Sequence, residues 1–216
     1  MQFKNVTIQN HKKNTTPIIN NISLDIKEGY ITVITAKDNT DILSLCKALT
    51  SPKKIYQGEI IYHDTDIFKN KNDWLDALGY ISDNNKFFEP LTIKQNIDIY
   101  SNLYKNFDET KFFKELKEFN ISDGSYIRNL SRGEFIKFQI VFAIAHNSKF
   151  LLFEDALAGL DIVFKKELLK YVANLLANED LSVVFISKNI DALKERSDYI
   201  YEFENGSLSN MKVGEY

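Results

Sequence analysis

The sequence lacks features that would place it in several broad classes of protein. It has a single cysteine, Cys46, among 216 residues. This excludes an internal disulfide framework and fits a reducing compartment. No unbroken apolar run is long enough to cross a bilayer, and the first residues, MQFKNVTIQNHKK, contain no signal-peptide core. We therefore expect no direct insertion into a membrane, and any membrane link would run through a partner.

An excess of basic charge is also missing. The formal net charge is -3 and the pI is about 5.7, so the composition does not favour nucleic acid or an anionic membrane surface as a ligand. A hydrophobic content of 44% over 216 residues is ordinary for one compact domain with a sizeable core. Cys46 lies on an apolar helix face, which predicts a buried structural thiol.

The most informative stretch runs from Leu130 to Asp161. Ser131 and Glu134 have the spacing of a helix capping box, and the apolar residues that follow recur at helical spacing to about residue 147. The apolar run 150–153 is typical of a strand buried in a parallel sheet. Glu154 and Asp155 end that run. Ligands bind at the carboxyl ends of such strands, so the acid pair suggests a metal or a catalytic base.

Alternating strands and helices from residue 31 onward predict an α/β fold with a mostly parallel sheet. Asn205-Gly206 is a strong signal for a hairpin near the end of the chain. Thr92 and Gln95 form a second predicted capping box. The predicted strands cover 3–8, 22–26, 30–35, 58–62, 78–82, 150–153, 181–186 and 199–204; helices are expected at 42–50, 72–77, 97–119, 131–147 and 161–176.

The series LSRGE, LLFED and ALAGLD resembles the signature, Walker B and D-loop motifs of the ATP-binding cassette (ABC) ATPases, the motor subunits of ABC transporters. Motif order and length match across nearly the whole chain. The resemblance implies a P-loop NTPase-like ABC ATPase fold over residues 1–216, with an antiparallel N-terminal β subdomain and a helical lobe at about 84–147. It also implies that ATP and Mg²⁺ lie between one subunit's Walker A loop and the other subunit's signature.

The Walker A position departs from the family pattern. The family's glycines fall on Ala36, Asn39 and Asp41, its lysine on Ile42 and its hydroxyl residue on Leu43. Asp38 and Asp41 add negative charge where phosphate would sit. Losing the lysine and metal contacts would remove roughly 4–6 kcal/mol, about a thousandfold or more in affinity. Lys37 lies at the wrong end of the loop to replace the lysine, so we expect no ATP or Mg²⁺ on the isolated chain.

Three further positions are altered in the resemblance. Glu154 takes the metal-side position of Walker B and Asp155 the general-base position, where it is one methylene short for orienting water. Asn189 replaces the family's histidine near the γ-phosphate. Asp83 replaces the glutamine of the Gln loop. A role as a simple turn residue explains this aspartate equally well. The alternative interpretation of Glu154 and Asp155 is that they are solvated residues at the end of a strand.

The signature is partly kept. Ser131 and Gly133 match the family, whereas Arg132 replaces a glycine and Glu134 a glutamine. The resemblance assigns this helix start to the γ-phosphate bound on the opposite subunit, with Arg132 adding a cation. A simple helix cap is the alternative. Asp161 matches the D-loop aspartate and also suits an N-cap.

The segment 87–96 resembles the family's lead-in to the helical lobe, which with the Gln loop receives the transmembrane subunit. We place that contact at Phe87, Phe88, Tyr100 and Tyr104. Ordinary lobe core is the alternative for each aromatic residue.

Together these features predict a pseudo-ATPase: a cytoplasmic subunit, peripheral to the membrane, that pairs with an intact ABC ATPase subunit and completes its partner's site. We expect it to serve a membrane exporter through a transmembrane subunit. The alternatives are a regulatory or scaffold protein outside transport and a slow homodimeric ATPase.

Overall fold

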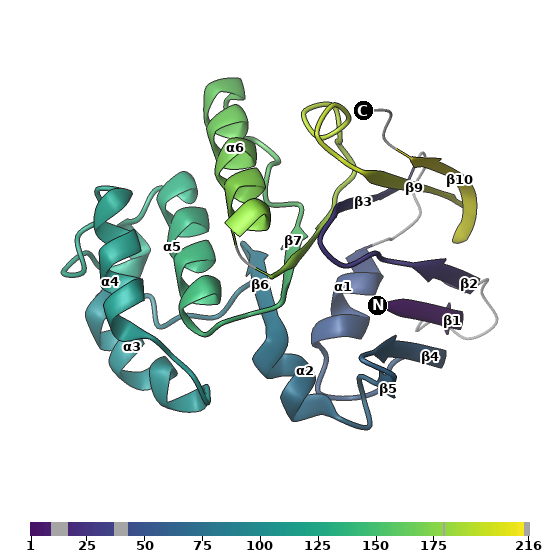
Figure 1. Ribbon diagram of the computed structural model, residues 1–216, viewed down its shortest axis with the longest axis horizontal. Helices are drawn as coiled ribbons and strands as arrows, with labels where there is room; N and C mark the ends of the chain where they lie inside the picture. Colours follow the sequence, from purple (N-terminus) through teal and green to yellow (C-terminus); the bar gives the residue numbers. More distant parts are fainter. Residues whose placement is uncertain (10–16, 37–42, 179, 214–216) are drawn as a thin grey trace.

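The computed structural model describes residues 1–9, 17–36, 43–178 and 180–213, and it comprises two sheets and a set of helices (Figure 1). The larger sheet has the strand order β10-β9-β3-β8-β7-β6. Its strands are β3 (Ile31–Ala36), β6 (Leu78–Ser82), β7 (Phe150–Glu154), β8 (Ser182–Ile186), β9 (Tyr199–Glu204) and β10 (Ser207–Val213).

Strands β3, β6, β7, β8 and β9 pair in parallel, whereas β10 returns antiparallel to β9. Every residue of β3, β7 and β8 is buried. For β7 the unbroken apolar run 150–153 predicts this, since such runs are typical of strands covered on both faces. The β9–β10 turn uses Asn205 and Gly206 at φ of 49° and 75°, the left-handed geometry that a two-residue hairpin requires. The predicted α/β fold is confirmed.

A smaller antiparallel sheet carries the N-terminal part of the chain, with the order β2-β1-β4-β5. Helix α1 lies between the two sheets, and its Leu45 and Cys46 are fully buried in a cluster that also contains Val6 and Val184. Cys46 is thus a core residue, as expected. The strands are β1 (Gln2–Ile8), β2 (Ile19–Asp25), β4 (Gln57–Tyr62) and β5 (Thr65–Asp66), and α1 spans Leu43–Thr50.

The helices α3, α4 and α5 gather beyond one edge of the larger sheet (Figure 1). Their shared core is rich in aromatic rings, with Phe112 and Phe138 fully buried. Both predicted capping boxes, Thr92 with Gln95 and Ser131 with Glu134, are confirmed. The helices are α2 (Lys71–Ala77), α3 (Ile93–Tyr100), α4 (Glu109–Glu118), α5 (Arg132–Ala145) and α6 (Ile162–Asn178), with 3₁₀ turns η1 (Ser101–Leu103) and η2 (Ile127–Asn129).

One predicted helix was too long. The pattern over 97–119 is broken between η1 and α4, because Asp108 caps a new helix by accepting from the Lys111 N–H at 2.8 Å. The Asp108 N–H donates to the Ala145 carbonyl at 2.8 Å, which ties this break to the end of α5. A polar cap followed by an amphipathic run had the same apolar spacing as one continuous helix.

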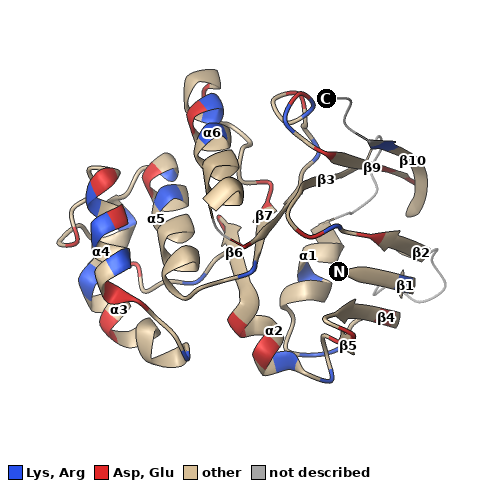
Figure 2. Cartoon of the chain, viewed as in Figure 1, with Lys and Arg blue, Asp and Glu red and all other residues tan. Residues whose placement is uncertain are grey.

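Acidic and basic residues are interspersed along α4, and neither sign dominates it (Figure 2). Within the described ranges, no helix has the length and apolar content needed to span a bilayer.

Candidate functional site

The carboxyl ends of three adjacent strands bring the predicted acidic residues together. Strands β6, β7 and β8 are neighbours in register, with Ser82 paired to Glu154 and Glu154 paired to Ile186. Asp83, Asp155 and Ser187 follow these strands directly. The sequence predicted that these side chains follow strands. The strand order places them next to one another along one polar edge of the sheet.

Glu154, the predicted metal-side residue, is held by two hydroxyl groups of β6. It is 8% exposed. Its Oε2 accepts from the Tyr80 hydroxyl and, at 2.7 Å, from Ser82 Oγ. Burial, together with the hydrogen bond to Glu154, raises the pKa of Tyr80 well above its ordinary range, so the phenol stays protonated and acts as a donor. The glutamate side chain is long enough to reach across to these donors.

Asp155, the predicted general base, is likewise bonded within the chain. Its backbone has a φ of 47°, and its Oδ1 accepts from Ser187 Oγ at 2.6 Å. The Ser187 hydroxyl also approaches the Asn189 carbonyl at 3.2 Å. Asn189 is exposed, and its Oδ1 accepts from the Asp191 N–H at 3.2 Å in a local turn. The amide that replaces the family's histidine therefore caps its own loop.

Arg132 pairs with Asp83 of the same chain. Its Nη2 lies 2.8 Å from Asp83 Oδ2, and its Nε donates to both carboxylate oxygens at 3.1 and 3.0 Å. Nη2 also donates to the Asp155 carbonyl at 3.3 Å. In this chain the guanidinium of Arg132 is therefore engaged internally, and Asp83 is its ion-pair partner. The contribution of Arg132 to a partner stays a prediction.

The start of α5 is an exposed helix cap. Ser131 Oγ accepts from the Glu134 N–H at 3.2 Å, and Glu134 Oε2 accepts from the Ser131 N–H at 2.8 Å. Hydrogen bonding of its carboxylate with the Ser131 side chain and with the Ser131 backbone N–H lowers the pKa of Glu134. The box uses the first and last of the four N–H groups that an α-helix leaves without helical acceptors, so those of Arg132 and Gly133 are the donors that remain at this end. Ser131 itself is exposed.

Gly133 has a packing role that the sequence did not reveal. A Cβ built at Gly133 would lie 2.6 Å from Cε2 of Phe164, on the first turn of α6. Glycine therefore lets α6 approach the start of α5. Asp161 Oδ1 accepts from the Phe164 N–H at 2.9 Å, which confirms Asp161 as the N-cap of α6 and fixes the segment that carries this ring.

The predicted phosphate loop is described only at its two ends. Ala36 is the last residue of β3 and is buried, and Leu43 opens α1 with its side chain packed against the core between the two sheets. An apolar, packed residue at this position offers no oxygen to a metal. The expectations for Lys37, Asn39, Asp41 and Ile42 lie outside the described residues.

Among the described residues, Leu43 has no side-chain oxygen to offer a magnesium ion, and Glu154 Oε2 already accepts two protein hydrogen bonds. No group of three or more His, Cys, Asp or Glu side chains that could hold a metal occurs in the parts of the chain that the structure describes.

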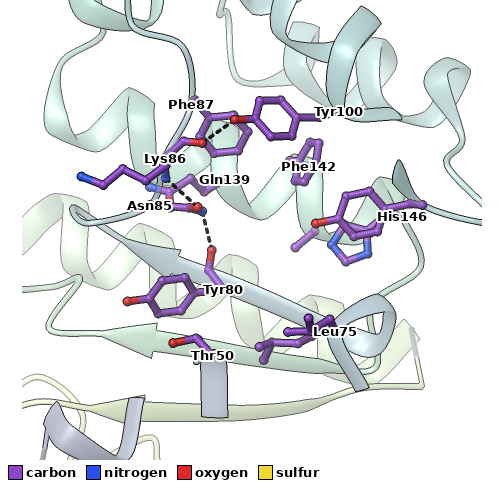
Figure 3. Close-up of a pocket in the computed structure, with 13 residues that line it drawn as sticks. Thr50, Leu75, Tyr80, Asn85, Lys86, Phe87, Tyr100, Gln139, Phe142 and His146 are labelled. Carbon is purple, nitrogen blue, oxygen red and sulfur yellow. Dashed lines mark hydrogen bonds between the residues drawn. The ribbon is translucent and has the colours of Figure 1, made fainter. Parts of the chain in front are cut away.

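The four aromatic residues predicted for the partner groove are brought together. The Phe87 ring meets the Tyr100 ring edge-on at 5.1 Å, and Phe88 lies 5.8 Å from Tyr100. Phe88 is 48% exposed. Phe87, Tyr100 and Tyr104 line a cavity of about 270 Å³ between the helical lobe and the larger sheet (Figure 3).

Sequence reasoning missed the polar residues of this cavity other than Tyr100 and Tyr104, among them Tyr80, Gln139 and His146. Gln139 is a polar residue within the otherwise apolar run 138–145 of α5, and it is 1% exposed. That interruption was the only local signal available. The Tyr104 ring stacks on His146 at 4.1 Å, a contact that sequence spacing alone does not reveal.

Comparison with known proteins agrees with this geometry. The family model described as ABC transporter matches residues 19–158. The ABC transporter ATP-binding protein YtrB of Bacillus subtilis is 22% identical over 90% of this chain and 66% of its own length. The molybdenum import ATP-binding protein ModC of a Shewanella strain, MR-4, is 28% identical over 78% of this chain and 47% of its own length. The chain thus spans between about half and two thirds of these relatives.

Solved structures share the fold. The ATP-binding cassette MJ0796, in a dimeric post-hydrolysis state bound to ADP and phosphate, superimposes with a TM-score of 0.84 at 17% identity. The match covers 98% of this chain and 97% of that one. A bacterial Atm1-family ABC exporter with ATP bound gives a TM-score of 0.79 at 18% identity, over 98% of this chain and 38% of the exporter.

Proposed function

We propose, given that this chain belongs to the ABC transporter family, that it is a cassette subunit with a degenerate nucleotide site of its own. In this proposal it pairs with an intact cassette, contributes its signature helix to the ATP site of that partner, and couples the pair to a transmembrane subunit. The chain would lie in the cytoplasm, held at the membrane by its partners.

One contrast carries the proposal. The groups that would serve the chain's own site are engaged internally, because Glu154 accepts from Tyr80 and Ser82 while Asp155 accepts from Ser187. The signature start, by contrast, is exposed at Ser131 and keeps donors available. Oriented N–H groups at a helix start attract phosphate. A site whose carboxylates are engaged internally, while its helix start offers donors to an external anion, is suited to completing another subunit's site.

The loss of the phosphate loop supports the first half of the proposal. The loop sequence supplies none of the family's glycines, its lysine or its hydroxyl residue, and Leu43 packs into the core. A leucine at the position of the family's hydroxyl residue has no side-chain oxygen to hold magnesium.

Pairing of Arg132 with Asp83 narrows the role of the signature. Its guanidinium is engaged within the chain, so the contribution to a partner's phosphate would come from the Ser131 hydroxyl and the N–H groups of Arg132 and Gly133. These are neutral donors on the positive end of a helix dipole. The proposed role therefore rests on donor geometry and does not need a free cation.

The membrane-facing part of the proposal rests on the aromatic groove. Phe87, Tyr100 and Tyr104 border the cavity between lobe and sheet, and Phe88 is exposed beside it. The relatives include proteins named for import and one named for export. These names do not favour the export that the sequence suggested, so the direction of transport follows from the transmembrane partner in this proposal.

A scaffold role outside transport is the second candidate. It is favoured by the internal hydrogen bonds of the strand ends, which hold this edge together without a nucleotide. A scaffold would form its complexes equally well after loss of the Ser131 hydroxyl, which separates it from the first candidate.

The decisive experiment reconstitutes the chain with an intact cassette and measures ATP hydrolysis by that partner. Ser131→Ala should lower the turnover by about tenfold or more, because a donor to the γ-phosphate is lost. The substitution also removes a helix cap. Thr92→Ala removes the cap of the other capping box, on α3, and is the matched control that should leave turnover unchanged.

Unchanged turnover with Ser131→Ala would refute the role in trans and favour the scaffold. Thermal unfolding of the isolated chain with Mg-ATP adds an independent check. Little stabilisation is expected, whereas a clear rise in the melting temperature would favour the homodimeric ATPase.

A further inference from the structure

One buried side chain, Gln139 of α5, connects the polar edge of the larger sheet with the cavity that it lines. Its Oε1 accepts from the Ser82 N–H at 3.0 Å and from Asn85 Nδ2 at 3.0 Å. Two donors on one atom identify that atom as the oxygen, so the other atom is the NH₂ group. Within the described residues, this Nε2 is among the buried side-chain atoms that have no hydrogen-bond partner.

A second buried polar atom of the same cavity has no partner either. His146 is 3% exposed and lines the cavity, and its Nδ1 is without a hydrogen-bond partner in the described part of the chain. Gln139 and His146 are seven residues apart, so both belong to one face at the end of α5. Because buried polar atoms are nearly always paired in folded proteins, two such atoms in one cavity indicate a ligand that pairs with both.

The polar part of that ligand should carry no charge. Burial lowers the pKa of His146 to about 4, so its imidazole is neutral at pH 7. Lys86 is exposed, and its ammonium group points away from the other lining side chains in Figure 3. A charged group placed beside Gln139 and His146 would lose its hydration without gaining a counter-charge.

Three hydroxyl groups of the lining are already used as donors. Thr50 donates to the Cys46 carbonyl at 2.8 Å, and Tyr100 donates to the Lys86 carbonyl at 2.6 Å. The Tyr80 hydroxyl donates to Glu154 outside the cavity. Polar recognition of a ligand therefore falls to Gln139 and His146.

The remaining walls suit an aromatic ring. Rings of Tyr80, Phe87, Tyr100 and Phe142 border the cavity from the sheet and the lobe (Figure 3). Its volume is about 270 Å³, whereas an apolar cavity of about 150 Å³ is enough for benzene. The space thus fits one ring with a small polar substituent, and it is below the range of about 300–1,000 Å³ usual for drug-sized ligands.

We propose that this cavity is a binding site for a small uncharged aromatic molecule whose single polar substituent both donates and accepts hydrogen bonds, as a primary carboxamide or a phenol does. The substituent would accept from Gln139 Nε2 and pair with His146 Nδ1, and the ring would pack between Tyr80 and Phe142. This site goes beyond the proposed function and does not rest on it, since the chain alone supplies every contact.

The side chains that would hold the ligand also hold Glu154. Tyr80 donates to Glu154, and Gln139 accepts from the backbone of Ser82, whose Oγ donates to Glu154 at 2.7 Å. A molecule bound in the cavity therefore contacts two residues that fix the carboxyl end of β6. This arrangement suits an effector that acts on the strand edge, and it predicts that the Ser82 N–H senses binding.

Four small probes test the proposal on the full chain without nucleotide at pH 7. Benzamide and 4-methylphenol carry the required substituent, toluene lacks a polar group, and benzoate has the shape of benzamide with a charge. Each is titrated while NMR follows the Gln139 side-chain amide, the His146 imidazole and the Ser82 N–H. We expect the tighter of benzamide and 4-methylphenol to bind at least about fivefold more tightly than toluene, because two hydrogen bonds are gained. Benzoate should bind more weakly than benzamide.

Two variants test the assignment of the polar contacts. Gln139→Met and His146→Phe keep the side chains large while removing the polar atoms, and each should reduce the preference over toluene. Having two variants protects the test if one of them fails to fold. His63→Phe is the matched control at an exposed histidine, and it should leave the preference unchanged. A separate hollow, lined by Tyr62 and Trp74 among others, reports non-specific binding of aromatic molecules.

Equal or tighter binding of toluene or benzoate would overturn the proposal, as would shifts confined to the Tyr62 and Trp74 hollow. A preference that survives in both Gln139→Met and His146→Phe would also overturn it. A Ser82 N–H that does not shift on saturation would overturn the link to Glu154. Because neither nucleotide nor a second cassette is present, failure here leaves the proposed role of Ser131 untouched.

Discussion

The guanidinium of Arg132 pairs with the carboxylate of Asp83 at 2.8 Å. This contact joins the start of α5, in the helical lobe, to the end of β6 in the larger sheet. Arg132 also reaches the Asp155 carbonyl after β7, and a Cβ at Gly159 would meet its Nη1 at 3.2 Å. One side chain thus links the positions predicted for the signature, Gln-loop, Walker B and D-loop motifs.

The Arg132–Asp83 pair should give a measurable coupling energy. A double-mutant cycle with Arg132→Gln and Asp83→Asn is expected to yield about 0.5–1 kcal/mol at low salt, because the geometry is bidentate but the carboxylate is exposed. Near 1 M salt the coupling should fall toward zero. Urea unfolding measures both. The exposed Lys194–Asp191 pair is the control, and a coupling no larger than that of the control would contradict the link.

Gly133→Ala should destabilise the protein although alanine favours helices. The new methyl group would overlap the Phe164 ring, which we expect to cost about 1–3 kcal/mol. Gly124→Ala is the control, because its nearest neighbour would be 3.6 Å away, and its effect should stay within about 0.5 kcal/mol. Chemical denaturation checks both.

If the ring is the cause, Phe164→Ala should make Gly133→Ala nearly neutral. An equally large loss in that background would assign the cost to something other than the Phe164 contact.

Tyr80→Phe should reveal how strongly Glu154 depends on its donors. Loss of the phenol leaves a buried carboxylate with one fewer hydrogen bond, which should cost about 1.5–3 kcal/mol of unfolding free energy. Glu154→Gln should then cost less in the Tyr80→Phe background than in the wild type. Tyr30→Phe, at a ring that is 43% exposed, is the control. If Tyr80→Phe and Glu154→Gln changed the free energy of unfolding independently, the result would argue against the hydrogen bond between Tyr80 and Glu154.

His146 should make the protein less stable at mildly acidic pH. Its folded pKa of about 4 lies below the ordinary value of 6.5, so the unfolded chain binds the proton first as pH falls. The contribution of neutral His146 to the free energy of unfolding is therefore fully present above pH 6.5. It declines between pH 6.5 and 4, by up to about 3 kcal/mol. The imidazole is faced by Asp76 and by the rings of Tyr104 and Phe142.

Urea unfolding at pH 7 and pH 5 measures this dependence. The decline should be smaller in His146→Phe and unchanged in His63→Gln, since His63 is exposed. The same decline in His146→Phe as in the wild type would assign it to the carboxylates instead.

The local signals in the sequence were sufficient for most of the fold. The capping boxes at Thr92 and Ser131, the Asn205-Gly206 hairpin and the apolar runs of β7 and β8 each depend on residues close together in the chain. Such signals act through backbone geometry and burial, which a short segment expresses by itself. The division of 97–119 was missed because apolar spacing does not register a cap at Asp108.

The sequence alone determined that the phosphate loop lacks the family's glycines, lysine and hydroxyl residue, since this is a matter of composition at fixed positions. It also placed Glu154 and Asp155 at the end of a buried strand. Only the tertiary structure decided what those carboxylates contact. It also decided that Arg132 pairs with Asp83 and that Phe164 packs against Gly133. Gln139 and His146 likewise share a cavity only in the folded chain. These contacts join residues far apart in the chain, and side-chain direction follows from strand order and helix packing, which local sequence does not contain.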